Sequence, residues 1–256
     1  MIPKTIHYIW FGEKQKPDKV LECIESWKKY CPDYTIIEWN ESNYDISQSQ
    51  FAYEAMLEGK WAFVSDYARL DIIYKHGGIY LDTDVELLKS LDPLMSDKAF
   101  MGFEDGKSVS SGLGFGSVKG FHLIKEMRDL YDGIRFKLDD GTLNTVACPV
   151  YTTEFLTQKG LIQDNTQQTI DGMVIYPSEY FSPKMPGYSK LKLTDNTYSI
   201  HHYDMSWVDN PSKLYKLKLT VSPLLQVIRG FLVKLIGEER FKKLRGTYTG
   251  NVEESI

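Results

Sequence analysis

Residues 77–88 read GGIYLDTDVELL, a short apolar run followed directly by two carboxylates. The run Ile79–Leu81 is too apolar for the exposed edge of a sheet, so it predicts a buried strand that ends where Asp82 and Asp84 begin. Ionised carboxylates beside a core cost several kcal/mol unless a cation or hydrogen bonds compensate them. The stretch therefore indicates that the chain either reaches the surface at Asp82 or binds a metal ion there.

The segments around this run predict an α/β fold. Alternating and apolar residues predict strands at Thr5–Phe11 and Tyr34–Trp39, and helical spacing predicts helices at Pro17–Tyr30 and Ala62–His76. The order strand, helix, strand, helix, strand is typical of a parallel sheet of the nucleotide-binding kind. We therefore expect an α/β protein with a mixed, mainly parallel central sheet. Further strands are expected at 99–103, 113–116, 174–176 and 197–201, and a long helix at 120–137.

The composition is that of an ordinary soluble protein. The 256 residues are 42% hydrophobic and 25% charged, with a formal net charge of −5. Three cysteines without metal-binding spacing indicate a reducing compartment. Residues 1–10, MIPKTIHYIW, lack the features of a signal peptide, and no apolar run reaches the roughly 18 residues of a membrane span. We expect a cytoplasmic protein.

The charge is unevenly distributed along the chain. Residues 213–256 hold nine basic and four acidic side chains, a net +5, so residues 1–212 carry −10. We expect one globular domain at 1–212 and a basic amphipathic helical tail at 213–256. Apolar residues within 224–236 form one stripe, which favours binding to an anionic membrane surface through residues 213–245. Packing of the tail on the domain or on a second copy is the alternative, and nucleic acid is not an expected partner of the acidic domain.

Asp82 and Asp84 lie where a ligand is expected in an open α/β sheet, at the carboxyl end of a strand. Two carboxylates suit Mg²⁺ or Mn²⁺, which also bind the oxygens of a diphosphate. Because an Asp-x-Asp sequence arises often by chance, its placement carries the prediction. The alternative is a solvated corner between a strand and a turn.

The stretch VSDYARL, residues 64–70, places Ser65, Asp66 and Arg69 on one face of a helix, expected to lie near Asp82. Arg69 is suited to a phosphate or a sugar hydroxyl, and Asp66 can accept hydrogen bonds from two hydroxyls of one ring. The alternative is an Asp–Arg pair on the surface.

The stretch SIHHYDMSW, residues 199–207, adds two histidines at a strand exit. An imidazole of His201 or His202 can supply a further metal ligand, and in a strand only one of the two points to a given site. Ser206 and Trp207 offer a hydroxyl and an indole N–H to phosphate oxygens. One core and one surface histidine is the alternative.

The stretch HYIWFG, residues 7–12, predicts a strand that ends in aromatic residues. Trp10 can lie under a nucleotide base, and Gly12 allows close approach of the backbone. A core position for Trp10 is the alternative.

Taken together, IPKTIHYIWFG, SDYARLDIIYKHGGIYLDTDVE and YSIHHYDMSW resemble glycosyltransferase family 32. That family includes bacterial capsular-polysaccharide sugar transferases, and it is distantly similar to the glucosylating domain of the large clostridial toxins. The resemblance covers residues 2–207. It implies a GT-A fold in a catalytic domain at 1–212, followed by a helical appendage, with a nucleotide-sugar donor and bound Mn²⁺ or Mg²⁺.

The resemblance also implies roles for single residues. Trp10 matches the aromatic residue that stacks on the nucleotide base, and Ser206 and Trp207 match the pair that closes over the diphosphate. The implied catalytic residues are Asp66, Arg69, Asp82 and Asp84. The implied donor-binding residues are Ile9, Trp10, Ser65, Asp66, Arg69, Asp82, Ser206 and Trp207. The implied metal ligands are Asp82, Asp84 and the pair His201 and His202, of which His201 is favoured.

The implied reaction is the metal-dependent transfer of a hexose from a UDP-linked sugar to a glycan acceptor, with retention of anomeric configuration. The acceptor is expected to be lipid-linked, in capsular or surface polysaccharide synthesis on the inner face of the cell membrane. Two alternatives stay open. IYLDTDVELL also fits the first motif of haloacid-dehalogenase-type phosphatases, with Asp82 as nucleophile and Asp84 as acid. A scaffold that binds a sugar nucleotide without turnover is the second alternative.

Overall fold

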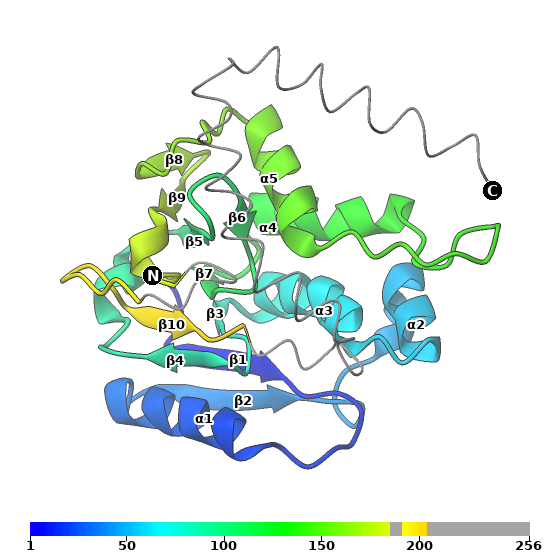
Figure 1. Cartoon of the computed structure of the whole chain (residues 1–256), viewed down its shortest axis with the longest axis horizontal. Coiled ribbons are helices and arrows are strands. Elements are labelled where there is room, and N and C mark those ends of the chain that lie inside the picture. The colour runs from blue at the N-terminus through cyan, green and yellow to red at the C-terminus, as the bar shows by residue number, and fades with distance from the viewer. Residues whose placement is uncertain (185–190, 204–256) are drawn as a thin grey trace, which may run out of the picture. The chain divides into compact units, whose positions relative to one another are not determined.

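The structure is a computed structural model that describes residues 1–184 and 191–203 (Figure 1). The predicted tail at 213–256, and with it the proposed boundary after residue 212, lies outside the described residues.

The helices are α1 Asp18–Tyr30, α2 Gln50–Leu57, α3 Trp61–His76, α4 His122–Asp129 and α5 Cys148–Gln158, with 3-10 turns η1 Ile46–Gln48, η2 Asp92–Ser96, η3 Leu130–Gly133 and η4 Ser178–Tyr180. The strands are β1 Thr5–Ile9, β2 Thr35–Trp39, β3 Gly78–Tyr80, β4 Val85–Leu87, β5 Ala99–Phe103, β6 Val109–Ser110, β7 Phe115–Ser117, β8 Gln168–Ile170, β9 Met173–Tyr176 and β10 Ser199–His201. None of the helices in this part of the chain has the length and hydropathy needed to cross a membrane.

The strands form a mixed sheet in the order β2-β1-β3-β7-β5-β9-β8, with β6 paired to β5, and β4 pairs with β10 in a separate two-stranded sheet. β1 runs parallel to β2 and to β3, and β5 runs parallel to β9. The remaining pairs are antiparallel. The predicted alternation of strands and helices thus produces the parallel unit β2-β1-β3, and the α/β class with a mixed central sheet is confirmed.

Side chains of the central strands alternate between two hydrophobic cores, one on each face of the sheet. In β5, Met101 and Phe103 belong to the core formed with α2, α3, α4 and α5, whereas Phe100 belongs to the core formed with α1. In the second core Trp27 of α1 is fully buried, and its indole N–H donates to the backbone carbonyl of Val85 in β4 at 2.7 Å. Among the described residues the central sheet is therefore covered on both faces, which leaves its edges open to ligands.

Two glycines turn the chain from α3 into β3. Gly77 and Gly78 have φ angles of 69° and 100°, in the left-handed region that favours glycine. A Cβ atom on Gly78 would lie only 2.7 Å from the carbonyl oxygen of Thr5 in the neighbouring strand β1. The glycines therefore let β3 begin directly beside β1, which places the end of β3 and the following Asp82 at the middle of the sheet.

The helix predicted at 120–137 is shorter in the structure. α4 ends at Asp129, and the chain continues through the turn η3 to Gly133. Tyr131 in this turn is buried in the core, and Gly133 is a poor helix former. The prediction of one long helix was therefore wrong beyond Asp129.

Two helices were not predicted, although each begins with a recognisable signal. The Ser49 hydroxyl accepts a hydrogen bond from the backbone N–H of Ala52 at 3.3 Å and caps α2. α5 carries Pro149 in its first turn, a common position for proline. The strands β4, β6 and β8 were also not predicted, and each spans only two or three residues.

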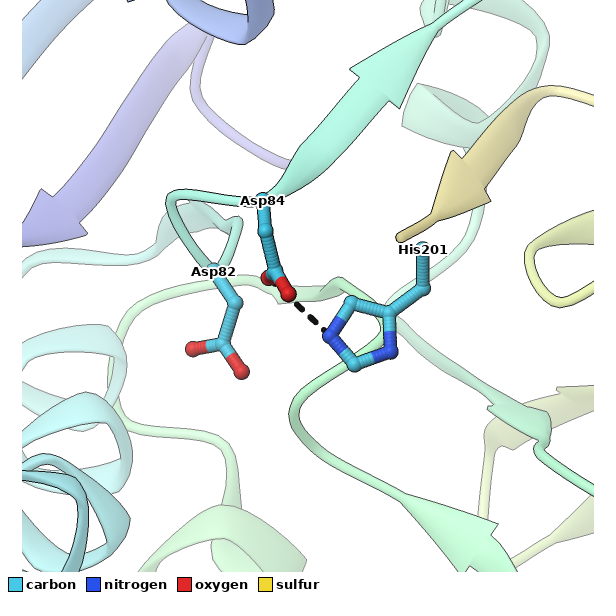
Figure 2. Close-up of side chains that lie close together, drawn as sticks. All are labelled: Asp82, Asp84 and His201. Atoms are coloured by element: carbon cyan, nitrogen blue, oxygen red, sulfur yellow. Dashed lines mark ion pairs between the residues drawn. The ribbon is translucent and has the colours of Figure 1, made fainter. Parts of the chain in front are cut away.

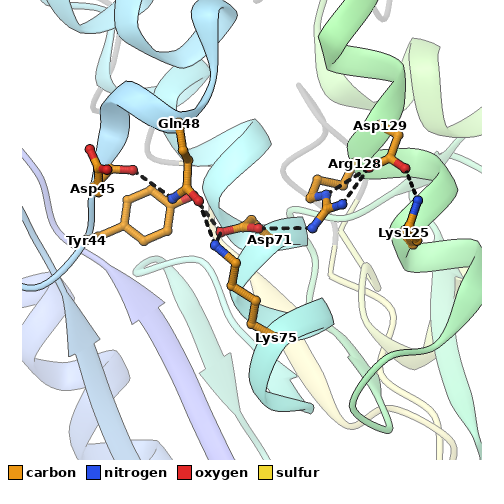
Figure 3. A network of polar contacts seen from close by, with 8 residues as sticks. All are labelled: Tyr44, Asp45, Gln48, Asp71, Lys75, Lys125, Arg128 and Asp129. Atoms are coloured by element: carbon orange, nitrogen blue, oxygen red, sulfur yellow. Dashed lines mark hydrogen bonds and ion pairs between the residues drawn. The ribbon is translucent and has the colours of Figure 1, made fainter.

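A buried carboxylate on α3 joins three segments of the helical layer (Figure 3). The Asp71 side chain is 1% exposed and contacts the hydroxyl of Tyr44 at 3.1 Å, the ammonium of Lys75 at 2.7 Å and the guanidinium of Arg128 at 3.3 Å. Tyr44 precedes η1 and Arg128 lies on α4. Asp71 therefore fixes α3, the helix that carries predicted donor residues, against both neighbours.

Candidate metal and donor site

Three side chains with metal-binding atoms meet beyond the end of β3 (Figure 2). Asp82 follows β3, Asp84 precedes β4, and the antiparallel pairing of β4 with β10 sets His201 opposite Val85. One possible ligand atom from each of Asp82, Asp84 and His201 lies within 4.8 Å of the others. Sequence segments more than a hundred residues apart thus supply one cluster.

The imidazole of His201 is held by Asp84. Its Nε2 atom lies 3.1 Å from Oδ1 of Asp84, and its buried Nδ1 atom has no hydrogen-bond partner within residues 1–184 and 191–203. Burial lowers the pKa of His201, but the hydrogen bond and charge of Asp84 outweigh burial, so this pKa lies above its usual value. The donor set of two carboxylates and one imidazole fits Mn²⁺ or Mg²⁺, with Mn²⁺ the more tolerant of nitrogen.

A buried arginine compensates the carboxylates beside the core. The Arg69 side chain is 5% exposed, and its Nη2 atom lies 3.1 Å from Oδ1 of Asp66 and 3.4 Å from Oδ1 of Asp82. Its Nε–H donates to the backbone carbonyl of Ser65 one turn earlier in α3, at 3.0 Å, which fixes the guanidinium. The cost of burying Asp82 is thus offset by a cation from α3.

A side chain of the preceding strand β3 also contacts Asp82. The hydroxyl of Tyr80 donates to Oδ1 of Asp82 at 2.8 Å, and the guanidinium of Arg69 lies 5.1 Å from the centre of the Tyr80 ring. Burial raises the pKa of Asp82 above its usual value despite the opposing charge of Arg69. Burial likewise raises the pKa of Asp66 to about 6, again against the effect of Arg69. A bound cation would favour the ionised form of these carboxyls.

A glycine and a thiol form the wall of the site next to Arg69. A Cβ atom on Gly112 would lie 2.8 Å from Oδ2 of Asp82 and 3.3 Å from Nη1 of Arg69, so only glycine fits there without displacement. The Sγ atom of Cys148, the first residue of α5, lies 3.7 Å from the Arg69 guanidinium and 3.6 Å from the Ser111 hydroxyl. The loop from β6 to β7 and the start of α5 therefore close this side of the pocket.

The other predicted donor residues lie nearby in the fold. Ile9 ends β1 and is buried, and Trp10 follows it at the same sheet edge as Asp82. The indole N–H of Trp10 donates to the Lys14 carbonyl at 2.6 Å, and the Lys16 ammonium lies over its ring, 5.9 Å from the ring centre. The hydroxyl of Ser65 donates to a carbonyl of its own helix.

The structure separates the two adjacent histidines. Nε2 of His202 lies 2.9 Å from the Glu86 carboxylate, outside the cluster that contains His201. This follows from the alternation of side chains along an extended chain. Ser206 and Trp207, predicted to close over the diphosphate, lie outside the described residues.

Several residues at the site were missed from the sequence. Tyr80 lies two residues before Asp82, on the same side of an extended chain, so its contact was predictable. Glu104 follows the predicted strand at 99–103, and the strand-end rule that identified Asp82 applies to it equally. No local pattern indicates that Gly112 and Cys148 approach Arg69.

The chain matches a known family over the segment that carries much of this site. Residues 17–101 match the family described as "Glycosyltransferase sugar-binding region containing DXD motif". Inositol phosphoceramide mannosyltransferase 3 of Schizosaccharomyces pombe is 30% identical over 134 residues, 50% of this chain and 37% of that protein. Inositol phosphoceramide mannosyltransferase 1 of the same organism is 27% identical over 107 residues, 39% of this chain and 33% of that protein. The chain thus spans about a third of the length of these curated relatives.

A solved structure shares the fold. The PaToxG glycosyltransferase superimposes with a TM-score of 0.50 at 22% identity, over 62% of this chain and 70% of that chain. At this identity the likeness shows the fold, and it confirms the expected GT-A type of α/β architecture. Residues 17–101 are thus similar to the DXD sugar-binding region of glycosyltransferases, and the chain shares its fold with a glycosyltransferase.

Proposed function

We propose that the chain is a metal-dependent enzyme that transfers a hexose from a nucleotide sugar to a glycan acceptor. The observation that carries the proposal is the convergence of Asp82, Asp84 and His201 next to the buried pair Arg69 and Asp66. Phosphatase chemistry, the alternative in which Asp82 acts as nucleophile, is less well supported, because Asp82 is already held by Arg69 and Tyr80. Similarity to glycosyltransferases favours the same choice.

The site residues act on the two groups that the breaking bond joins, the diphosphate and the donor sugar. A divalent cation held by Asp82, Asp84 and His201 would stabilise the negative charge of the departing diphosphate as a Lewis acid. Arg69 holds Asp66 in place, and the Asp66 carboxylate accepts hydrogen bonds from hydroxyls of the donor sugar. Trp10 stacks on the base, and Ser206 and Trp207 donate to the diphosphate.

The proposed donor and acceptor are supported by the names of the two mannosyltransferase relatives. The names of both yeast relatives specify a mannosyl group and inositol phosphoceramide, a lipid. They support a hexose donor and a lipid-linked acceptor for this chain. A UDP-linked donor, retention of configuration, and a role in capsular or surface polysaccharide synthesis complete the proposal.

The location proposed for the enzyme is the cytoplasm, peripheral on the inner face of the membrane through residues 213–245. In full-length protein, exchange of Lys213, Lys216 and Lys218 for Glu should reduce flotation with anionic liposomes. Equal flotation of this variant and the original protein would contradict membrane binding by these lysines.

The test of the enzyme is release of nucleoside diphosphate from a panel of nucleotide sugars with Mn²⁺. Asp84→Ala should abolish release, and chelation of the metal should do the same reversibly. Asp33→Ala is the matched control, because the Asp33 carboxylate is exposed and pairs with Lys4. Release that survives complete chelation would refute the metal site, whereas tight donor binding without release would favour the inactive scaffold.

A further inference from the structure

Glu104 lies at the same edge of the sheet as Asp82. It directly follows β5, and since β3 and β5 both run antiparallel to β7, their carboxyl ends point to one edge. The backbone N–H of Glu104 donates to the Ser108 carbonyl at 2.7 Å, which fixes the turn. Within the described ranges its half-buried side chain makes no hydrogen bond or ion pair.

The surroundings of Glu104 are residues of the metal cluster. Burial raises the pKa of Glu104 to about 7, the charge of His201 lowers it, and the charges of Asp105 and Asp82 raise it. Burial and then the charge of Glu104 raise the pKa of Tyr203, two residues after His201. The Glu104 carboxyl group, at the same edge of the sheet as Asp82, is therefore within electrostatic range of Asp82 and His201.

A carboxylate in this position selects its ligand by charge. In its ionised form Glu104 repels phosphate oxygens, which carry the same sign. Glu104 is also not part of the group whose atoms lie within 4.8 Å for one ion, which consists of Asp82, Asp84 and His201. Its lone pairs suit a neutral donor, and a sugar hydroxyl is such a donor.

The turn that holds Glu104 leads into a groove. A cavity of about 490 Å³ lies along α5 and is lined by Ser108, Pro149, Val150 and Thr153, among others. Pro149 follows Cys148, which contacts Arg69, so the groove begins next to the wall of the donor site. Ser108, whose carbonyl accepts from the Glu104 backbone N–H, thus connects this turn to a groove lined by hydroxyl, amide and apolar side chains and by the Glu154 carboxylate.

We propose that Glu104 binds the acceptor: its carboxylate accepts a hydrogen bond from a hydroxyl of the acceptor sugar. The proposal rests on the function proposed above. Asp66 and Arg69 hold the donor sugar from α3, and Glu104 holds the acceptor from the end of β5. The two sugars then meet next to the cluster that takes the diphosphate.

The test separates transfer from hydrolysis of the donor by water. With p-nitrophenyl glycosides as acceptor probes, Glu104→Gln should lower the ratio of glycoside product to hydrolysed donor at least tenfold. The apparent KM for the glycoside should rise, and the Mn²⁺ affinity should stay within twofold of the original. Glu22→Gln, which removes an exposed carboxylate on α1, should leave the product ratio as it was.

Each other outcome counts against the acceptor assignment. An equal fall in transfer and hydrolysis would make Glu104 part of the donor site, and a tenfold loss of Mn²⁺ affinity would make it a metal ligand. If no glycoside raises nucleoside diphosphate release by the original protein, the acceptor assignment fails while hydrolysis still supports the proposed function. Absence of hydrolysis with every donor would instead refute the proposed function. The Glu104→Gln variant must have a melting temperature close to that of the original protein.

Discussion

Nε2 of His201 lies 3.1 Å from Oδ1 of Asp84, and this contact depends on the pairing of β4 with β10. β4 continues from the Asp-x-Asp turn, whereas β10 arrives from the far end of the described chain. The cluster therefore forms only when both strands are in register. A shift of one residue would direct His202 toward Asp84 and turn His201 away.

The first prediction concerns Mn²⁺ affinity and pH. A metal ion requires the neutral imidazole, and Asp84 holds the pKa of His201 above its usual value. Protons therefore compete with the metal, and Mn²⁺ affinity should rise as the pH increases through and above neutrality. His201→Ala should weaken Mn²⁺ binding on the order of tenfold or more and flatten this dependence. Calorimetric titration of Mn²⁺ at several pH values measures both.

His202→Ala is the matched control for this prediction, because its imidazole pairs with Glu86 outside the cluster. It should leave Mn²⁺ affinity within about threefold. If His202→Ala weakened Mn²⁺ binding more than His201→Ala, the assignment of His201 as the third metal ligand would be wrong.

The second prediction concerns the glycine beside Asp82. Gly112→Ala places a methyl group 2.8 Å from Oδ2 of Asp82, closer than a stable contact, so Asp82 or the loop must move. We expect a loss of at least tenfold in donor turnover, with a fall in the free energy of unfolding of about 1–3 kcal/mol. Gly133→Ala is the control, since a Cβ there meets open space. Unchanged turnover in Gly112→Ala would show that the position of Asp82 is not critical.

The third prediction is a pH dependence of stability caused by His7. A carbonyl only accepts and an indole N–H only donates, so the imidazole donates from Nε2 to the Gly77 carbonyl and accepts at Nδ1 from Trp39, each at 3.0 Å. Burial lowers the pKa of His7 to about 4, against 6.5 for a free histidine. The unfolded chain therefore binds a proton more readily than the folded one. The contribution, about 3 kcal/mol, is fully present above pH 6.5 and is lost as the pH falls toward 4.

Urea unfolding between pH 7 and pH 4 measures this dependence. His7→Asn should be less stable at pH 7 and should lose less further stability at pH 4 than the original protein. His122→Asn, at an exposed position, should follow the original curve. If the stability of His7→Asn fell between pH 7 and pH 4 as steeply as that of the original protein, groups other than His7 would cause the acid sensitivity.

The sequence predicted the centre of the fold better than its second half. β1, β2 and β3 each combine apolar runs with clear breaks, and strand ends follow from those breaks, so the positions of Asp82 and Asp84 were predictable. The preference for His201 over His202 came from the family resemblance alone, because a period of two leaves both orientations open until the register with β4 is known. α5 contacts the site through Cys148, and contacts of this kind depend on tertiary packing that no local pattern specifies.

The fourth prediction concerns the network of Asp71 (Figure 3). Asp71→Ala removes the acceptor shared by Tyr44, Lys75 and Arg128, and it leaves the partly buried Arg128 with one fewer anionic partner. The free energy of unfolding should fall by about 3 kcal/mol, the size expected when one member of a buried ionic group is removed. Lys75→Ala should cost less than about 1 kcal/mol, because its ammonium is half-exposed. Urea unfolding of both variants checks the order. If Lys75→Ala cost as much as Asp71→Ala, the stabilisation would come from the exposed pair rather than from the buried link between α3 and α4.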